Sequence, residues 1–231
     1  MSEHTKKIEL SPAVAIIIAG LIIAGAIVFT NNRQPAVVAN AGAAAAPTIS
    51  GDSIRKPSAG DHLIGSLTAP IVLIEYSDFQ CPYCSMVYPT LKKIVDESKG
   101  QIAWIYREFP LTSIHPQALP AANAAECIAG QLGSAGFWKY ADAVFNNQAA
   151  LNPAYSRSLA QQFGADMGKY DQCISASTYQ KNIDTDTAEA EAAGGNGTPF
   201  TIVLNTKTGK AAPVSGALPY DQIMSVIKSV Q

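Results

Sequence analysis

The stretch 71-IVLIEYSDFQCPYC-84 decides the fold of this 231-residue chain. The run 71–77 is short and nearly continuously apolar, which is typical of a buried central strand. After the second cysteine, apolar residues recur at helical spacing until Lys99-Gly100, which ends the predicted helix. The two cysteines therefore lie at a strand-to-helix turn, at the N-terminus of the helix.

This position points to redox chemistry, because two cysteines separated by two residues can close and reopen a small disulfide. Unpaired N–H groups and the helix dipole stabilise a thiolate on Cys81. An ordinary cysteine titrates near about 8.5, whereas cysteines in such motifs titrate at about 3.5–7. A stabilised thiolate leaves easily and favours the reduced form, so it makes the disulfide a stronger oxidant. We therefore predict that Cys81 is the reactive sulfur and that Cys84 is the buried resolving thiol.

A static disulfide and half of a zinc site are the alternatives for this pair. Zinc requires a second pair of cysteines or histidines at close spacing. Cys127 and Cys173 stand alone, and neither His62 nor His115 has a matching partner. We predict no metal and no cofactor. His115 is either a groove residue near the active site or an unpaired histidine on a surface loop, and we favour the second because the sequence shows no partner for it.

Glu75 lies inside the apolar strand, shortly before Cys81. A carboxylate there is costly unless it has a partner or stays protonated. Two interpretations remain open: a strand-end residue that faces water, or a buried acid that passes protons to and from Cys84.

The N-terminus predicts a membrane anchor. The uncharged apolar run from Pro12 to Phe29 would form about 27 Å of helix, close to the thickness of a bilayer core. Lys6 and Lys7 precede it, which places the N-terminus inside. The predicted parts are a cytoplasmic N-terminus (1–11), a transmembrane anchor (12–30), a flexible linker (31–60) and a catalytic domain (61–231).

A cleaved signal peptide is the alternative, but its apolar region is typically only about 7–15 residues long. The nearest convincing cleavage site, Ala39-Asn40-Ala41, lies well beyond the apolar run. In both cases the domain is extracytoplasmic, where disulfides persist. Cys127 and Cys173 are then either a structural disulfide or two separately buried thiols.

The remaining pattern predicts a second strand, a helical region and a final pair of strands. The formal net charge of −2 and the lack of a long Lys/Arg run exclude a nucleic-acid-binding role. The region 117–193 is rich in alanine and lacks β-formers. The predicted strands are 102–109, 201–205 and 210–216, and the predicted helices are 117–130, 135–148, 154–163, 166–175, 177–193 and 219–230.

The strand with Glu75, the two cysteines and Pro89 inside the helix resemble the first βα unit of the thioredoxin superfamily. The string 75-EYSDFQCPYC-84 is similar to the DsbA-like thiol–disulfide oxidoreductases of bacteria. The resemblance covers residue 61 to the end. It implies an α/β, thioredoxin-like fold with an inserted α-helical subdomain at about 117–193, and a buried acid at Glu75. It also implies a cis-proline loop facing the cysteines, which Thr198-Pro199 matches.

The family implies an enzyme that introduces disulfides into secreted or envelope proteins with free thiols. Pro82, Tyr83, Thr198 and Pro199 would contact the substrate peptide. A quinone-linked membrane protein of the DsbB or vitamin K epoxide reductase type would reoxidise the cysteines. The expected location is the bacterial cytoplasmic membrane, as a single-pass protein with an extracytoplasmic catalytic domain.

Two other functions remain open. Pro82-Tyr83 differs from the Pro-His of typical oxidants, and Thr198 stands where these carry valine, so a disulfide isomerase or reductase is one alternative. A non-catalytic peptide-binding domain with a thioredoxin fold is the other, because fold does not determine function.

Overall fold

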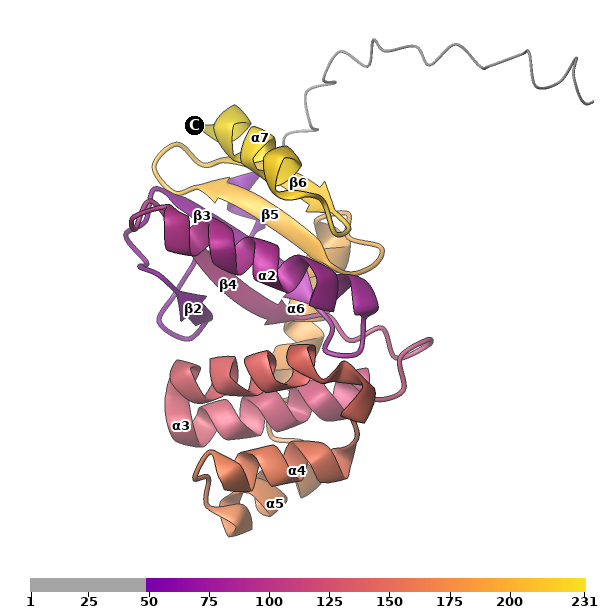
Figure 1. Ribbon diagram of the computed structural model, residues 1–231. Coiled ribbons are helices and arrows are strands. Elements are labelled where there is room, and N and C mark those ends of the chain that lie inside the picture. The colour runs from indigo at the N-terminus through magenta and orange to yellow at the C-terminus, as the bar shows by residue number, and fades with distance from the viewer. Residues whose placement is uncertain (1–48) are drawn as a thin grey trace, which may run out of the picture. The chain divides into compact units, whose positions relative to one another are not determined.

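The computed structural model describes residues 49–231 (Figure 1). Its strands are β1 (Ile49–Ser50), β2 (His62–Ile64), β3 (Ile71–Ser77), β4 (Ile102–Glu108), β5 (Phe200–Asn205) and β6 (Lys210–Ser215). Its α-helices are α2 (Pro82–Glu97), α3 (Ala118–Asn146), α4 (Pro153–Gln162), α5 (Met167–Ser175), α6 (Gln180–Ala192) and α7 (Tyr220–Val230). Two 3-10 helices complete the secondary structure of this region, η1 (Gly51–Ser53) and η2 (Gln148–Ala150).

The strands of the described region form one mixed sheet in the order β1-β6-β5-β3-β4-β2. β3 and β4 are parallel, with Glu75 opposite Tyr106. β5 is antiparallel to β3, with Thr201 opposite Glu75. A parallel pair needs a crossover connection, and α2 supplies it. This crossover begins at the carboxyl end of β3, directly after which the cysteines lie.

Both faces of the sheet are covered, because every residue of β3 and β4 is buried. Leu73 belongs to the hydrophobic cluster that contains residues of α2, α3 and α7. The next residue, Ile74, belongs to a second cluster that contains Ala190 of α6. Figure 1 shows α2 and α7 on one face of the sheet, with α6 behind it and α3, α4 and α5 packed together beside it.

The helical insert follows the expected boundaries closely, including the break inside α3. The sequence predicts two helices, over 117–130 and 135–148, and α3 consists of two helices that meet at a kink. The kink lies at Gly133, which has a φ of 68°. This left-handed region favours glycine, so the chain changes direction there without a separating loop.

The linker prediction was wrong for residues 49–60, which belong to the folded unit. β1 pairs with β6, and Ile54 is buried in the cluster beneath α6. The Arg55 guanidinium lies 2.6 Å from an Asp186 carboxylate oxygen, and Arg107 lies 3.0 Å from Asp61. A two-residue strand, one buried side chain and ion pairs leave no hydrophobic periodicity, so the sequence pattern could not reveal this segment.

The predicted N-terminal segments at 1–11 and 12–30 lie outside the described residues, as does the linker up to residue 48. Within residues 49–231, no helix is long and apolar enough to span a membrane.

Cys127 and Cys173 form a disulfide, which links α3 to α5. The alternative of two separate buried thiols was therefore wrong. The sequence separation of 46 residues makes this a long closed loop, and loop closure limits the entropy of the unfolded chain.

Removing this disulfide should lower stability without removing the redox site. Replacing both Cys127 and Cys173 with alanine is expected to reduce the free energy of unfolding by up to about 4 kcal/mol, the chain-entropy value for a loop of this size. Urea denaturation of both proteins, with Cys81 and Cys84 kept reduced, measures the difference. Equal stability of the two proteins would contradict an entropic contribution from this loop.

Candidate active site

The cysteine turn, residues 78–84, is held by backbone hydrogen bonds at the start of α2. Cys81 is the N-cap residue, and its N–H donates to the Asp78 carbonyl oxygen at 3.0 Å. Its own carbonyl oxygen accepts the N–H of Cys84 at 3.1 Å. Pro82 occupies the first helical position, where its missing N–H has no intrahelical partner to lose. The turn therefore presents two free cysteines, Cys81 at 3% exposed and Cys84 fully buried.

The Cys81 thiol is the more acidic of the two. A hydrogen bond from the Cys84 thiol is the largest cause that lowers the pKa of Cys81, which falls to about 6 although burial opposes it. The Thr198 hydroxyl and the N–H groups of Cys84 and Tyr83 act in the same direction. The N-terminus of α2 thus stabilises a thiolate, as its position predicts.

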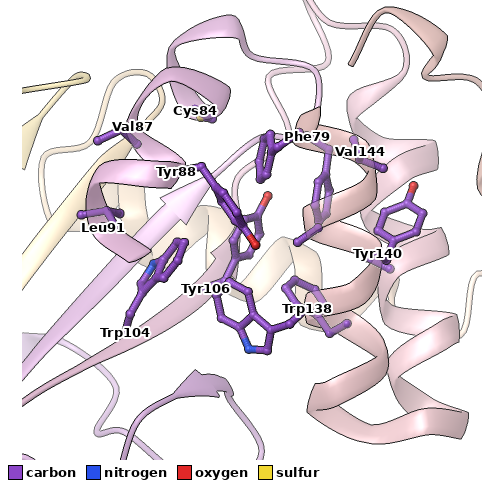
Figure 2. Close-up of a cluster of buried hydrophobic side chains, with 14 of the residues drawn as sticks. Phe79, Cys84, Val87, Tyr88, Leu91, Trp104, Tyr106, Trp138, Tyr140 and Val144 are labelled. Atoms are coloured by element: carbon purple, nitrogen blue, oxygen red, sulfur yellow. The ribbon is translucent and has the colours of Figure 1, made fainter. Parts of the chain in front are cut away.

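Cys84 has the opposite character. Burial raises the pKa of its thiol well above the ordinary value, and the hydrogen bond to Cys81 and the charge of Glu75 raise it further. Figure 2 shows Cys84 at the top of a layer of buried aromatic side chains that includes Phe79, Tyr88 and Tyr106. A proton on this sulfur is therefore strongly held.

Glu75 is 1% exposed, so the interpretation of a water-facing carboxylate was wrong. The Ser77 hydroxyl donates to its Oε1 at 2.9 Å, and the Trp104 indole N–H donates to its Oε2 at 3.0 Å. Burial nevertheless raises the pKa of Glu75 to about 7, against these two hydrogen bonds. The carboxyl group can therefore gain or lose a proton near neutral pH.

The loop before β5 faces the cysteine turn, although it is more than a hundred residues away in sequence. The Thr198-Pro199 peptide bond is cis, as the resemblance implies. The Cys81 thiol donates to the Thr198 carbonyl oxygen at 3.4 Å. Within residues 49–231 the buried Thr198 hydroxyl has no hydrogen-bond partner, so it is available to donate to a Cys81 thiolate.

Trp104 and Tyr106 of β4 complete this buried layer, and the sequence analysis named neither. The parallel pairing places Tyr106 beside Glu75, and Tyr106 stacks on Phe79 with ring centroids 5.1 Å apart. Alternation along β4 puts both side chains on the face covered by α2 and α3 (Figure 2). The alternation was visible in the sequence, but the strand pairing that brings them to Glu75 was not.

Glu108 is a second buried acid on this face of β4. Neither of its carboxyl oxygens has a hydrogen-bond partner among the described residues. Burial raises the pKa of Glu108 well above its ordinary value, and the nearby charges of Glu126, Asp186 and Asp78 raise it further. Burial and these neighbouring charges therefore favour the protonated form of this side chain.

His115 is not an unpaired surface histidine, contrary to the expectation from sequence. Its Nδ1 lies 2.8 Å from the Asp78 carboxylate, which also accepts the N–H of Leu111 at 2.9 Å and of Gln80 at 2.7 Å. Asp78 thereby ties the loop after β4 to the cysteine turn. The partner lies far away in sequence, so only the folded chain shows the pair.

The surroundings of Cys81 carry exposed apolar side chains. Pro82 is exposed, and Tyr83 and Met86 in the first turns of α2 are 59% and 61% exposed. Ile114, on the loop that Asp78 holds, is 67% exposed. Among residues 49–231 no group of three or more acidic, histidine or cysteine side chains could hold a metal ion. The site therefore offers sulfur chemistry beside an apolar surface.

A family model described as "Thioredoxin" matches residues 58–228. Among curated proteins, the Na(+)/H(+) antiporter NhaA 1 of Salinispora arenicola is 32% identical over 143 residues, which is 62% of this chain and 21% of that protein. NhaA 1 of Mycolicibacterium vanbaalenii is 33% identical over 145 residues, 62% of this chain and 23% of that protein. The chain thus spans about a fifth of the length of the curated relatives it matches.

Solved structures of low sequence identity share the fold. Pseudomonas aeruginosa DsbA2 superposes with a TM-score of 0.65 at 24% identity, covering 77% of this chain and 97% of that one. Wolbachia pipientis alpha-DsbA1 has a TM-score of 0.65 at 22% identity, covering 79% and 96%. BdbD from Bacillus subtilis has a TM-score of 0.63 at 20% identity, covering 77% and 97%. With a family model that spans most of its length, the chain belongs to the thioredoxin family, and it shares its fold with these DsbA and BdbD structures.

Proposed function

We propose that the chain is an extracytoplasmic thiol–disulfide oxidoreductase that introduces disulfides into proteins with free thiols. The observation that carries this proposal is the contrast between its two cysteines. The pKa of Cys81 is lowered to about 6, whereas the pKa of Cys84 is raised well above its ordinary value. A stabilised thiolate beside a thiol that holds its proton is the arrangement that disulfide exchange requires.

The first step of the reaction is attack on the Cys81 sulfur of the oxidised protein. A substrate thiolate forms a new disulfide bond with Cys81, and the bond between Cys81 and Cys84 breaks. Cys84 leaves as a thiolate into a buried site that raises its pKa, so it takes up a proton. Glu75 is the nearby acid, with a pKa of about 7.

The second step releases the oxidised substrate. Another thiolate of the substrate attacks the substrate sulfur of the mixed disulfide, and Cys81 leaves as a thiolate. The donors that lower the pKa of Cys81 stabilise this leaving group. The substrate has then gained a disulfide, and the protein holds Cys81 and Cys84 as a dithiol.

The substrate is proposed to bind as an extended peptide along Thr198. A peptide in that position can pair with the backbone in a strand-like manner. The exposed side chains of Tyr83, Met86 and Ile114 supply apolar surface beside Cys81, which suits unfolded chains with exposed hydrophobic residues. Pro82 and Pro199 shape the turn and the loop on which these contacts depend.

The proposed location and partners come from the sequence. The apolar segment 12–30 would anchor the protein in the bacterial cytoplasmic membrane, with the redox domain outside. Secreted and envelope proteins would be the substrates. A quinone-linked membrane protein of the DsbB or vitamin K epoxide reductase type would return Cys81 and Cys84 to the disulfide.

The reduction potential of the Cys81–Cys84 pair tests the direction of electron flow. A pKa of about 6 leaves roughly ten thiolates for each thiol at pH 7, which stabilises the reduced form. We expect a potential displaced from about −270 mV, typical of a reductant, toward about −120 mV, typical of an oxidant. Equilibration with glutathione redox buffers and quantification of both forms measures it.

A reductase or isomerase is the second candidate. It is favoured by the pKa of Cys81, because a value of about 6 lies closer to the upper value of about 7 for such motifs, that of thioredoxin, than to the lower value of about 3.5. A measured potential near −270 mV would replace the oxidant proposal with this one.

A further inference from the structure

Gln148 connects the helical insert to the cysteine turn. It is the first residue of η2, two residues after the end of α3, and its side chain is half-buried. The amide nitrogen donates to the Phe79 carbonyl oxygen and to the Cys81 carbonyl oxygen, both at 2.9 Å. The two hydrogens of one side-chain amide therefore join both ends of the segment 79–81.

These hydrogen bonds matter because of the carbonyls they reach. The Phe79 carbonyl has no other donor among the described residues. The Cys81 carbonyl belongs to the N-cap residue and already accepts the N–H groups of Cys84 at 3.1 Å and Ser85 at 3.2 Å. Gln148 is thus a third donor to the carbonyl that lies on the same residue as the reactive sulfur.

Two further hydrogen bonds join α3 to the cysteine turn and to the start of α2. The Ser85 hydroxyl donates to the carbonyl oxygen of Phe145 at 3.1 Å, in the last turn of α3. At the other end of α3, the N–H of Gln117 donates to the side chain of Gln80 at 2.6 Å. The insert therefore holds the cysteine turn from both ends of α3, whose two helices meet at the kink at Gly133.

Two physical effects follow from the Gln148 contacts. The amide fixes the backbone of the turn, and with it the direction of the Cys81 side chain. It also places the positive end of an N–H dipole at the Cys81 carbonyl, which reduces the negative charge that this oxygen presents to a thiolate on the same residue. Neither effect requires Gln148 to touch the substrate.

We infer that Gln148 is a positioning residue through which the helical insert sets the geometry and the reactivity of Cys81. This inference adds a residue to the site of the proposed function. It also gives the insert a role in the chemistry beyond adding to the hydrophobic core.

The test compares Gln148→Leu with a matched control, Gln131→Leu. Gln131 is also a half-buried glutamine on the insert, and it also makes two hydrogen bonds with its amide. Its Nε2 donates to the Asp166 carbonyl at 3.3 Å, and its Oε1 accepts the Asp166 N–H at 2.9 Å, away from the cysteine turn. Both variants lose equivalent contacts, so general destabilisation affects both.

The measurement is the rate at which iodoacetamide alkylates reduced Cys81 as a function of pH, together with thiolate absorbance. The midpoint of this pH profile reports the pKa of Cys81. In Gln148→Leu the midpoint should rise to a higher pH, and alkylation at pH 6 should slow threefold to tenfold, which corresponds to about one net hydrogen bond. Gln131→Leu should keep the midpoint of the unmodified protein. Equal midpoints in all three proteins, or equal shifts in both variants, would overturn the inference.

A second variant keeps the test decisive if Gln148→Leu does not fold. Gln148→Asn retains the amide but loses the reach to both carbonyls, and its midpoint should also rise. An unchanged midpoint in this variant would count against Gln148. The alkylation profile does not depend on disulfide transfer, so failure of the proposed function would appear separately, as an unmodified protein that transfers no disulfide to a reduced substrate.

Discussion

Cys81→Ser is expected to lose all measurable thiol–disulfide exchange, whereas Cys84→Ser is expected to accumulate mixed disulfides with its substrates. The difference follows from the two environments. Cys81 has the lowered pKa and lies beside Thr198, where a peptide can approach. Cys84 is fully buried, so it can resolve a bond already made to Cys81 but cannot begin one.

Incubation of each variant with a reduced, unfolded protein, followed by acid quenching and non-reducing electrophoresis, distinguishes them. Replacement of both Cys127 and Cys173 with alanine serves as the control, because it removes two sulfurs but leaves the cysteine turn intact. That control should still transfer disulfides. Activity in Cys81→Ser, or mixed disulfides formed through Cys84 alone, would be incompatible with the proposed mechanism.

Local patterns explain why the centre of the fold could be predicted from sequence. β3, the cysteine turn and α2 are consecutive in the chain, and each has a periodicity or a bounding residue that sequence shows directly. The bounds of β3 match the prediction at both ends. The assignment of Cys81 as the reactive sulfur and of Cys84 as the buried resolving thiol needed only their positions at the start of a helix.

Contacts between distant segments explain what sequence could not show. Trp104 reaches Glu75 because β4 lies parallel to β3, and Gln148 reaches Cys81 across 67 residues. Neither residue type signals such a role by itself. His115 is a further example, since its pairing with Asp78 spans 37 residues. Single side-chain hydrogen bonds of this kind leave no periodic trace in a sequence.

Two buried acids, on β3 and β4, reduce the stability of the folded protein. Glu75 and Glu108 occupy strand positions where an apolar side chain would pack without loss. Burial raises the pKa of Glu108 well above its ordinary value, which favours its uncharged form. Glu75 titrates near neutral pH, so its contribution to stability must change within the range in which the protein works.

Glu75→Gln is therefore expected to change the pH dependence of stability and to slow exchange. The pKa of Glu75 is about 7 in the folded protein against an ordinary 4.5, so between these values the folded state binds more protons than the unfolded state. The unmodified protein must then lose about 3 kcal/mol of stability as pH rises through this window. Glutamine does not titrate, so the variant lacks this loss.

Urea denaturation of both oxidised proteins between pH 4 and 8.5 isolates the effect, because the disulfide keeps the cysteines from titrating. At pH 4 the variant should be the less stable protein, since its amide can accept from only one of Ser77 and Trp104 through its oxygen. At pH 8.5 the order should reverse. The step in which Cys84 gains or loses its proton should become slower and lose its pH dependence near 7. Parallel stability curves would show that Glu75 does not titrate in this range, and the proton-transfer role would then fall to another group.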